Sequence, residues 1–185
     1  MSNAPGALYP AILRGLPGLY IHREPSRSCL AGSVRCVLEE IMANSAAGAA
    51  SDFNSKIIEE FRANEGRIGG SFAGTPMILI HHIGARSGIE RVTPLACSHQ
   101  GEGRFVVVAS NGGSPVHPDW YYNLKANPRI TVEVGTQAFG VLAEELQGAE
   151  RAELWPKLVA EFPAVAEHQA KTTRQIPVMM LTRQD

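Results

Sequence analysis

The sequence predicts a mainly β domain of the α+β class, built from short antiparallel strands with helices around them. Ile130, Val132 and Val134 alternate with polar residues, which is the pattern of a half-buried strand. Glycine-containing turns join this segment and similar ones, at residues 84–88, 100–103 and 135–136. Short strands joined by tight turns favour a barrel or a sandwich over a parallel sheet.

The predicted domain begins with a helix. Phe53, Ile57 and Phe61 repeat at helical spacing after Asp52, which can cap the first amides. Asn64-Glu65-Gly66 ends this helix with a glycine. The extended segments that follow are expected over residues 77–82 and from residue 90 towards 98, on either side of the turn at residues 84–88.

The segment from Arg104 to Pro128 is the centre of the prediction. A β-branched run leads into Ala109-Ser110, then into the pair Gly112-Gly113 and a short helix that starts near Pro118. A strand, a backbone-exposing turn and a helix in this order can offer N–H groups and an aromatic wall to a flat, anionic ligand.

Helices and one strand complete the predicted domain. Leu154 and Leu158 lie four residues apart in a helical segment over residues 149–162. Pro156 is expected either to start a new helix there or to kink the existing one. A further helical piece is expected over residues 162–168, and a last strand over residues 176–181.

The N-terminal fifty residues differ from the rest. Four prolines break the first half, and an alanine-rich stretch over residues 43–51 has the composition of a linker. We expect residues 1–50 to be a flexible leader and residues 51–185 to be one domain. A sharper hypothesis is that Met42 is the true start of the protein.

Composition excludes several classes of protein. The formal net charge of −1 over 185 residues gives no electrostatic case for nucleic-acid binding. No apolar run approaches the ~18 residues that a membrane-spanning helix needs, although peripheral contact with a membrane stays open. Cys29, Cys36 and Cys97 are an odd, scattered set of cysteines, which indicates free thiols in a reducing compartment. We therefore expect a cytoplasmic protein.

Common catalytic motifs are absent. His81 and His82 are adjacent on a predicted strand, so they point to opposite faces and cannot share a metal ion. The Gly-x-Ser-x-Gly elbow of serine hydrolases does not occur, and no glycine-rich segment matches a Walker loop or a dinucleotide fingerprint. We therefore expect no metal and no covalent nucleophile.

Donor groups near two turns form the candidate site. Arg86, Ser87, Arg91 and Ser110, with the amides from Asn111 to Gly113, fit an anion-binding turn, although solvated turn residues would look the same. Trp120 and Leu124 can form either a ligand wall or part of the core. Asn123 is then expected to be a local hydrogen bonder.

Five motifs in order resemble the deazaflavin-dependent nitroreductase family, which uses coenzyme F420. They are the helix that starts at Asp52; Gly84-x-Arg86-Ser87-Gly88; residues 91–95; Ala109-Ser110-x-Gly112-Gly113; and Pro118-x-Trp120-Tyr121-x-Asn123-Leu124-x-Ala126-Asn127-Pro128. The resemblance implies a split β-barrel of the FMN-binding, flavin-reductase-like kind, with about six antiparallel strands and flanking helices. It also implies an oxidoreductase that transfers a hydride from the reduced deazaflavin to a bound quinone-like or nitroaromatic acceptor.

The same resemblance implies the residues of the site. Those near the phosphate and along the deazaflavin would be Arg86, Ser87, Gly88, Arg91, Thr93, Pro94, Ser110, Asn111, Gly112, Gly113, Trp120, Asn123 and Leu124. Those around the acceptor would be Ala96, Phe162, Val165 and His168. Because histidine exchanges protons near neutral pH, His168 is a candidate proton donor to the reduced product.

The chain departs from the family pattern at three places. Ala85 and Asn111 stand where basic residues often occur, which predicts a weaker hold on the anionic tail. None of the predicted acceptor residues is the tyrosine that nitro-reducing members carry there, so a quinone is the preferred acceptor class. The alternatives are an F420 carrier without catalysis and an FMN-binding protein of the same fold, in either case a monomer or a homodimer.

Overall fold

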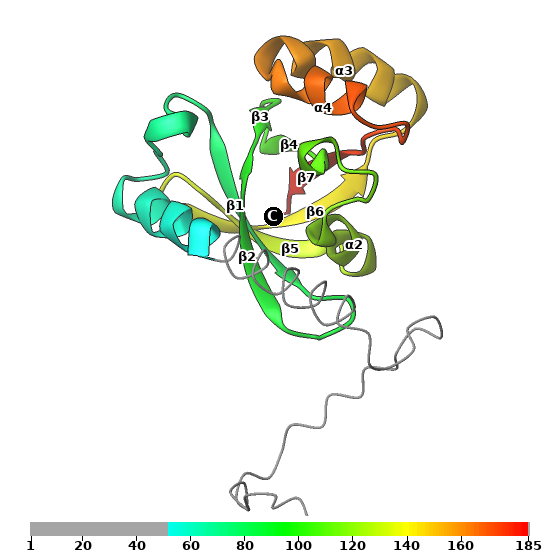
Figure 1. Ribbon diagram of the computed structural model, residues 1–185. Helices are drawn as coiled ribbons and strands as arrows, with labels where there is room; N and C mark the ends of the chain where they lie inside the picture. Colours follow the sequence, from blue (N-terminus) through cyan, green and yellow to red (C-terminus); the bar gives the residue numbers. More distant parts are fainter. Residues whose placement is uncertain (1–51, 185) are drawn as a thin grey trace, which may run out of the picture. The chain divides into compact units, whose positions relative to one another are not determined.

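A seven-stranded sheet forms the centre of the computed structural model, which describes residues 52–184 (Figure 1). The strands are β1 (Met77–Ile83), β2 (Glu90–Ala96), β3 (Ser98–His99), β4 (Arg104–Val108), β5 (Arg129–Val134), β6 (Gln137–Glu145) and β7 (Val178–Arg183). Their order across the sheet is β2-β1-β5-β6-β7-β4-β3, and every pairing is antiparallel.

The sheet curls into a barrel because its two edge strands are neighbours along the chain. β2 and β3 lie at opposite edges, yet Cys97 alone separates them. The chain therefore passes from one edge of the sheet to the other within a single residue, which requires the sheet to curl round into a barrel. The predicted antiparallel barrel is therefore confirmed, with β3 as a two-residue addition to the expected strands.

The helices lie outside this barrel or at its end. The first helix covers residues 52–63. The others are α2 (Asp119–Ala126), α3 (Gly148–Glu161) and α4 (Ala164–Ala170), with the 3₁₀ turns η1 (Gly70–Phe72) and η2 (Asn111–Gly113). Pro156 lies within α3, which continues through it. The proline is exposed, so water can hydrogen-bond to the carbonyl group that lacks an N–H partner there.

Apolar side chains from all the long strands fill the barrel. Ile80, Val107, Val132 and Leu181 meet there, since every second residue of a strand points to the same face. Leu124 of α2 is fully buried against them, a burial that contributes about 2 kcal/mol. α2 thus closes one end of the barrel with its apolar side.

The helix over residues 52–63 covers the outer face of β1 and β2. Its Ile57 and Phe61 pack against Leu79 of β1. Arg62 donates to Glu133 of β5, and this hydrogen bond is the main reason that the pKa of the Glu133 carboxyl lies below its usual value. The predicted amphipathic helix is therefore confirmed, with an ion pair at its end.

α3 covers the outer face of β4 and β7 on the other side. Leu154 and Leu158 pack against Val106 and Val178, and α4 follows directly, beside η2 (Figure 1). None of the helices within residues 52–184 has the length and apolar character to cross a membrane. The predicted leader and the alternative start at Met42 lie outside the described residues.

Candidate active site

The predicted cationic turn is an open hairpin tip between β1 and β2. The Gly84 N–H donates to the Ile89 carbonyl at 2.9 Å, and the Gly88 N–H returns to the Gly84 carbonyl at 2.8 Å. Arg86 and Arg91 are both exposed. Because neither guanidinium forms a salt bridge with any residue between 52 and 184, both are available to an anion.

Asn123 joins α2 to this hairpin through a buried network. Its Oδ1 accepts from the backbone N–H of Ala85 at 2.8 Å, and its Nδ2 lies 3.0 Å from His82 Nδ1. His82 Nε2 in turn lies 2.9 Å from Thr93 Oγ1. Asn123 is thus not a local hydrogen bonder but connects α2, β1 and β2.

His82 is neutral in this network. His82 is buried, with only 3% of its surface exposed. Burial lowers the pKa of its imidazole, and the positive charge of Arg91 lowers it further. His81, by contrast, points to the opposite face of β1 and bonds Glu133 at 2.7 Å, so the predicted split between the two histidines is confirmed.

The predicted residues of β2 divide between the two faces of the sheet. Arg91 and Thr93 pair with His82 and Ile80, which face the barrel interior. Pro94 and Ala96 pair with Leu79 and Met77, which face the helix over residues 52–63. The structure therefore groups Thr93 with Arg91, while ligand contacts of Pro94 and Ala96 stay predictions.

The glycine turn at η2 has a backbone that favours anion binding. Ser110 is right-handed at φ −72° and Asn111 is left-handed at φ 49°, a combination that points successive N–H groups to one side. The first of these groups, the Ser110 N–H, is already bonded to the Val108 carbonyl at 2.9 Å. Gly112 and Gly113 continue with positive φ. The Asn111 side chain turns back and donates to the Val116 carbonyl at 3.1 Å, so it ties its own loop.

The two glycines of this turn have different surroundings. A Cβ on Gly112 would meet nothing within 4 Å, whereas a Cβ on Gly113 would lie 2.7 Å from the His168 carbonyl oxygen of α4. Gly113 therefore lets α4 approach the turn. The predicted acceptor residues Phe162, Val165 and His168 lie at the end of α3 and in α4, beside η2.

His168 carries an unsatisfied atom in this region. Its Nδ1 is buried and has no hydrogen-bond partner among the described residues. A buried ring nitrogen without a partner is costly, and it is therefore a candidate position for contact with a ligand.

Arg174 holds the glycine turn, although no sequence pattern singles this residue out. Its Nη2 donates to the Ser110 carbonyl at 2.7 Å and to the Ala109 carbonyl at 3.2 Å, and its Nε donates to the Ser114 carbonyl at 2.8 Å. Its Nη1 lies 2.9 Å from His117 Nδ1. Burial, then the charge of Arg174, lowers the pKa of His117, so His117 accepts this bond.

Trp120 and Leu124 belong to the barrel interior. Trp120 is 7% exposed and Leu124 is fully buried, and both pack with the strands. The core alternative for these two residues is what the structure describes, so contact with a ligand stays a prediction for them.

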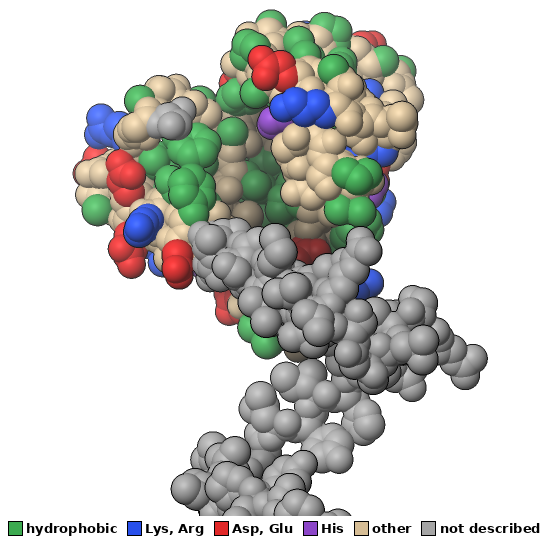
Figure 2. Space-filling model, in the orientation of Figure 1, with side chains coloured by type: hydrophobic (Ala, Val, Ile, Leu, Met, Phe, Trp, Pro, Cys, Tyr) green, Lys and Arg blue, Asp and Glu red, His purple; other side chains and the backbone are tan. Residues whose placement is uncertain are grey.

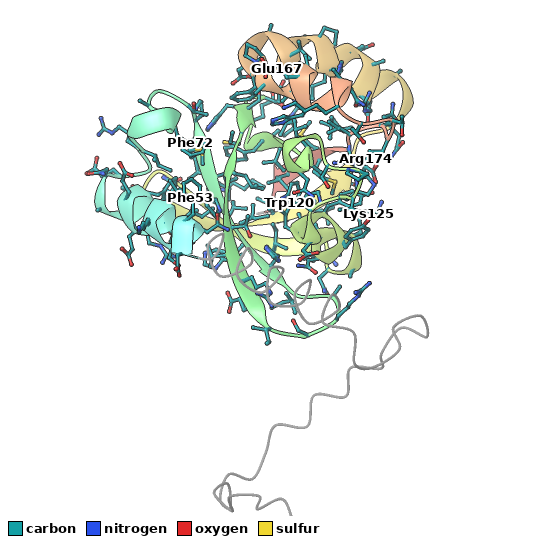
Figure 3. All side chains as sticks on the ribbon, in the orientation of Figure 1. Phe53, Phe72, Trp120, Lys125, Glu167 and Arg174 are labelled. Carbon is teal, nitrogen blue, oxygen red and sulfur yellow. The ribbon has the colours of Figure 1, made fainter. Side chains whose placement is uncertain are left out.

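A hollow opens between the lobe with residues 52–72 and the lobe with α3 and α4, and hydrophobic side chains line its walls (Figure 2). Figure 3 labels Phe53 and Phe72 on one lobe and Glu167 of α4 on the other. The two phenylalanine rings lie 6.4 Å apart, and Phe53 is 54% exposed. Such walls suit a flat, apolar molecule.

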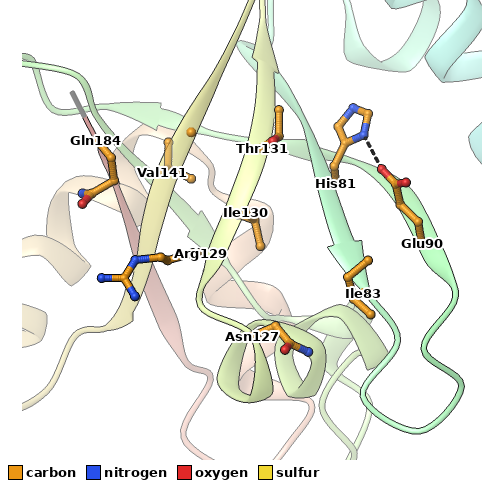
Figure 4. Close-up of a pocket in the computed structure, with 10 residues that line it drawn as sticks. His81, Ile83, Glu90, Asn127, Arg129, Ile130, Thr131, Val141 and Gln184 are labelled. Carbon is orange, nitrogen blue, oxygen red and sulfur yellow. Dashed lines mark hydrogen bonds and ion pairs between the residues drawn. The ribbon is translucent and has the colours of Figure 1, made fainter.

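A separate cavity of about 510 Å³ lies on the outer face of the sheet (Figure 4). Residues of β1, β2, β5 and β6 line it, among them His81, Glu90 and Thr131. His81 Nδ1 is bonded there to Glu90 at 3.2 Å. None of the predicted coenzyme residues lines this cavity. Several of the residues that line it are exposed, so it is an open depression of the surface.

The barrel, the cationic hairpin and the glycine turn together define a split-barrel protein with a candidate anion-binding site. The family model for F420H(2)-dependent quinone reductases matches residues 55–183. The chain belongs to this family. An F420H(2)-dependent quinone reductase of Mycobacterium tuberculosis is 41% identical over 128 residues, which cover 66% of this chain and 85% of that protein.

Solved structures agree with this family. A structure described as an F420-H2 dependent reductase is 42% identical, with a TM-score of 0.53, and the match covers 57% of this chain and 93% of that one. A structure described as a domain-swapped dimer is 35% identical, with a TM-score of 0.55, and covers 73% and 98%. The F420-dependent part of the predicted resemblance is thus confirmed, while the matched family is named for quinones.

Proposed function

We propose that this chain is an F420-dependent oxidoreductase that reduces a quinone-like acceptor. The observation that carries the proposal is that Arg86 and Arg91 are exposed and form no salt bridge with any residue between 52 and 184. A second surface is the glycine turn at η2, which packs against α4. An anionic coenzyme with a flat ring and an apolar acceptor require these two kinds of surface.

The groups at the first turn suit the coenzyme's anionic tail. Arg86 and Arg91 offer planar guanidinium forks, which fit phosphate oxygens well. Ser87 and Gly88 belong to the same turn, and Thr93 offers a hydroxyl on the same face of β2 as Arg91. We propose that these residues hold the tail, and that residues 110–113 lie along the deazaflavin.

The acceptor is proposed to bind between the glycine turn and α4. When bound, the reduced deazaflavin supplies a hydride. Phe162 and Val165 exclude water from the acceptor, and His168, whose Nδ1 lacks a partner, gives a proton to an acceptor oxygen. Nitroaromatic acceptors are proposed as secondary, because no tyrosine stands at these positions or at Ala96.

Three wider features are also proposals. The coenzyme-binding domain is proposed to span residues 51–185, which agrees with the match to residues 55–183. A cytoplasmic location is proposed because Cys97 is a free thiol. A homodimer is proposed alongside the monomer because a related structure is described as a domain-swapped dimer.

The direct test mixes the purified chain with reduced F420 and menadione and follows the absorbance of the coenzyme. Oxidation well above the rate without protein is expected. His168→Asn should lower this rate about a hundredfold while F420 affinity is kept, since general acids contribute roughly that much. Glu167→Gln, on the exposed side of α4, is the matched control. Oxidation at the rate without protein, across several quinones, would contradict the proposal.

A further inference from the structure

We propose that His82 and Asn123 are positioning residues that make the Thr93 hydroxyl a hydrogen-bond donor to an oxygen of the bound coenzyme. This inference rests on the function proposed above. It gives a role to His82, which none of the family motifs contains. It also means that Asn123 acts on the ligand through His82 and Thr93 and does not touch the ligand itself.

The backbone of Ala85 fixes the orientation of the Asn123 amide. A backbone N–H can only donate, so the Asn123 atom that lies 2.8 Å from it must be the amide oxygen. The other atom is then the NH₂ group, which can only donate, and it lies 3.0 Å from His82 Nδ1. His82 Nδ1 therefore accepts a hydrogen bond and carries no proton.

The Asn123 amide in turn fixes the tautomer of His82. A neutral imidazole with an unprotonated Nδ1 carries its proton on Nε2. That proton points to Thr93 Oγ1, 2.9 Å away. The Thr93 oxygen thus accepts from His82, and its own hydrogen cannot point back towards the ring.

The position of Thr93 brings its hydroxyl close to the proposed anion site. Thr93 is half-buried, and it lies on the same face of β2 as Arg91, two residues away. A ligand whose anionic part is held by Arg91 therefore meets a hydroxyl that is already set to donate. Pre-set donors cost no reorganisation when the ligand arrives.

Calorimetric titration with oxidised F420 tests the ligand side of the proposal. Thr93→Val removes the hydroxyl at nearly constant shape, and we expect about a tenfold loss of affinity, the value of one well-made hydrogen bond. Thr131→Val is the matched control. Thr131 pairs with His81 on the opposite face of the sheet, so its loss should leave the affinity unchanged.

A double-mutant cycle tests whether His82 acts through Thr93. His82→Phe keeps a ring but loses both nitrogens. In the chain that retains Thr93, we expect it to lower F420 affinity, by less than the tenfold loss expected for Thr93→Val. In the Thr93→Val background it should cost nothing further. A purely structural role of His82 predicts the same loss in both backgrounds, and that result would overturn the proposal.

The tautomer itself is measured by long-range ¹H–¹⁵N NMR on the full chain without coenzyme. A proton on His82 Nε2 is expected, and a proton on Nδ1 would overturn the inference. If the unmodified chain fails to bind F420, the proposed function fails, and this inference fails with it. If the chain binds F420 but Thr93→Val binds equally well, the inference alone fails.

Discussion

The two turns of the candidate site are held in opposite ways. The hairpin tip at residues 84–88 carries exposed side chains, and the Ala85 N–H, which donates to Asn123 Oδ1, ties its backbone to α2. The glycine turn is held by Arg174, which bonds three backbone carbonyls and His117. α4 packs directly against Gly113.

This difference matches what each turn is proposed to recognise. Attraction between charges falls off slowly with distance, so flexible arginines at a tip can attract an anionic tail without a fixed geometry. A reacting ring has to be held within a fraction of an ångström, which requires a backbone that does not move. In the proposed complex, electrostatic capture and precise placement therefore fall to different turns.

The largest expected effect comes from removing the bonds of Arg174. Arg174→Met keeps much of the side-chain length but leaves three carbonyls and His117 without their donor. We expect the free energy of unfolding to fall by about 3 kcal/mol, measured by urea denaturation. Arg104→Met is the control, because Arg104 forms an exposed pair with Glu102 at 3.5 Å and such pairs contribute little. Equal small losses for both variants would contradict the role of Arg174.

The second prediction compares the neighbouring glycines of η2. Gly112→Ala should cost about 1 kcal/mol, because its φ of 63° is unfavourable for alanine but its Cβ has open space. Gly113→Ala should cost roughly 2 kcal/mol more, because its Cβ would collide with the His168 carbonyl and with Lys171. Thermal unfolding of both variants measures the difference. A Gly113→Ala variant as stable as Gly112→Ala would mean that α4 is free to shift.

The hairpin should behave in the opposite manner. Changing both Arg86 and Arg91 to Ala should weaken F420 binding about thirtyfold at low salt while the free energy of unfolding stays nearly constant. The loss should shrink as salt rises, and it should vanish for a deazaflavin without the anionic tail. Arg67→Ala, which loses an exposed pair with Glu65, is the control. An equal loss of affinity for the tail-free compound would show that these arginines do not act by holding the anionic tail.

The smallest effect is the pH dependence of the buried network. Burial, followed by the charge of Arg91, lowers the pKa of His82 in the folded state, so the unfolded chain binds a proton first as pH falls. The stability that the network contributes is full above about pH 6.5, the ordinary value for histidine, and it is lost as pH falls through the lower folded value.

Urea denaturation above and below that range measures this loss. The decline in the free energy of unfolding should be smaller for His82→Phe than for the unmodified chain. Some decline should persist in the variant, because the pKa of His117 is lowered as well. Identical declines would show that His82 does not titrate with unfolding.

The sequence predicts the elements whose pattern is local. The alternation of residues 130–134, the repeat of Phe53, Ile57 and Phe61, and the glycine turns all depend on neighbours within a few positions. The structure agrees with the strands, the first helix and the antiparallel barrel arrangement. Asn123 brings α2 to the hairpin, while the grouping of the two donor-rich turns around one ligand stays a prediction.

Long-range bonds are what the sequence does not indicate. Arg174 bonds partners that lie 57 to 65 residues earlier, and it stands in an irregular stretch without periodicity. Asn123 looks like a local hydrogen bonder, but its partners lie 38 and 41 residues away. The split of Thr93 and Pro94 between the faces of β2 does follow from strand alternation, and this signal was available before the structure.

The most direct test of the account is a pair of calorimetric titrations of the same preparation with F420 and with FMN. The separation into a cationic tip and a fixed glycine turn predicts tight binding of F420, with its long anionic tail, and binding of FMN that is weaker by at least about tenfold, or 1.4 kcal/mol. Equal or tighter binding of FMN would contradict it.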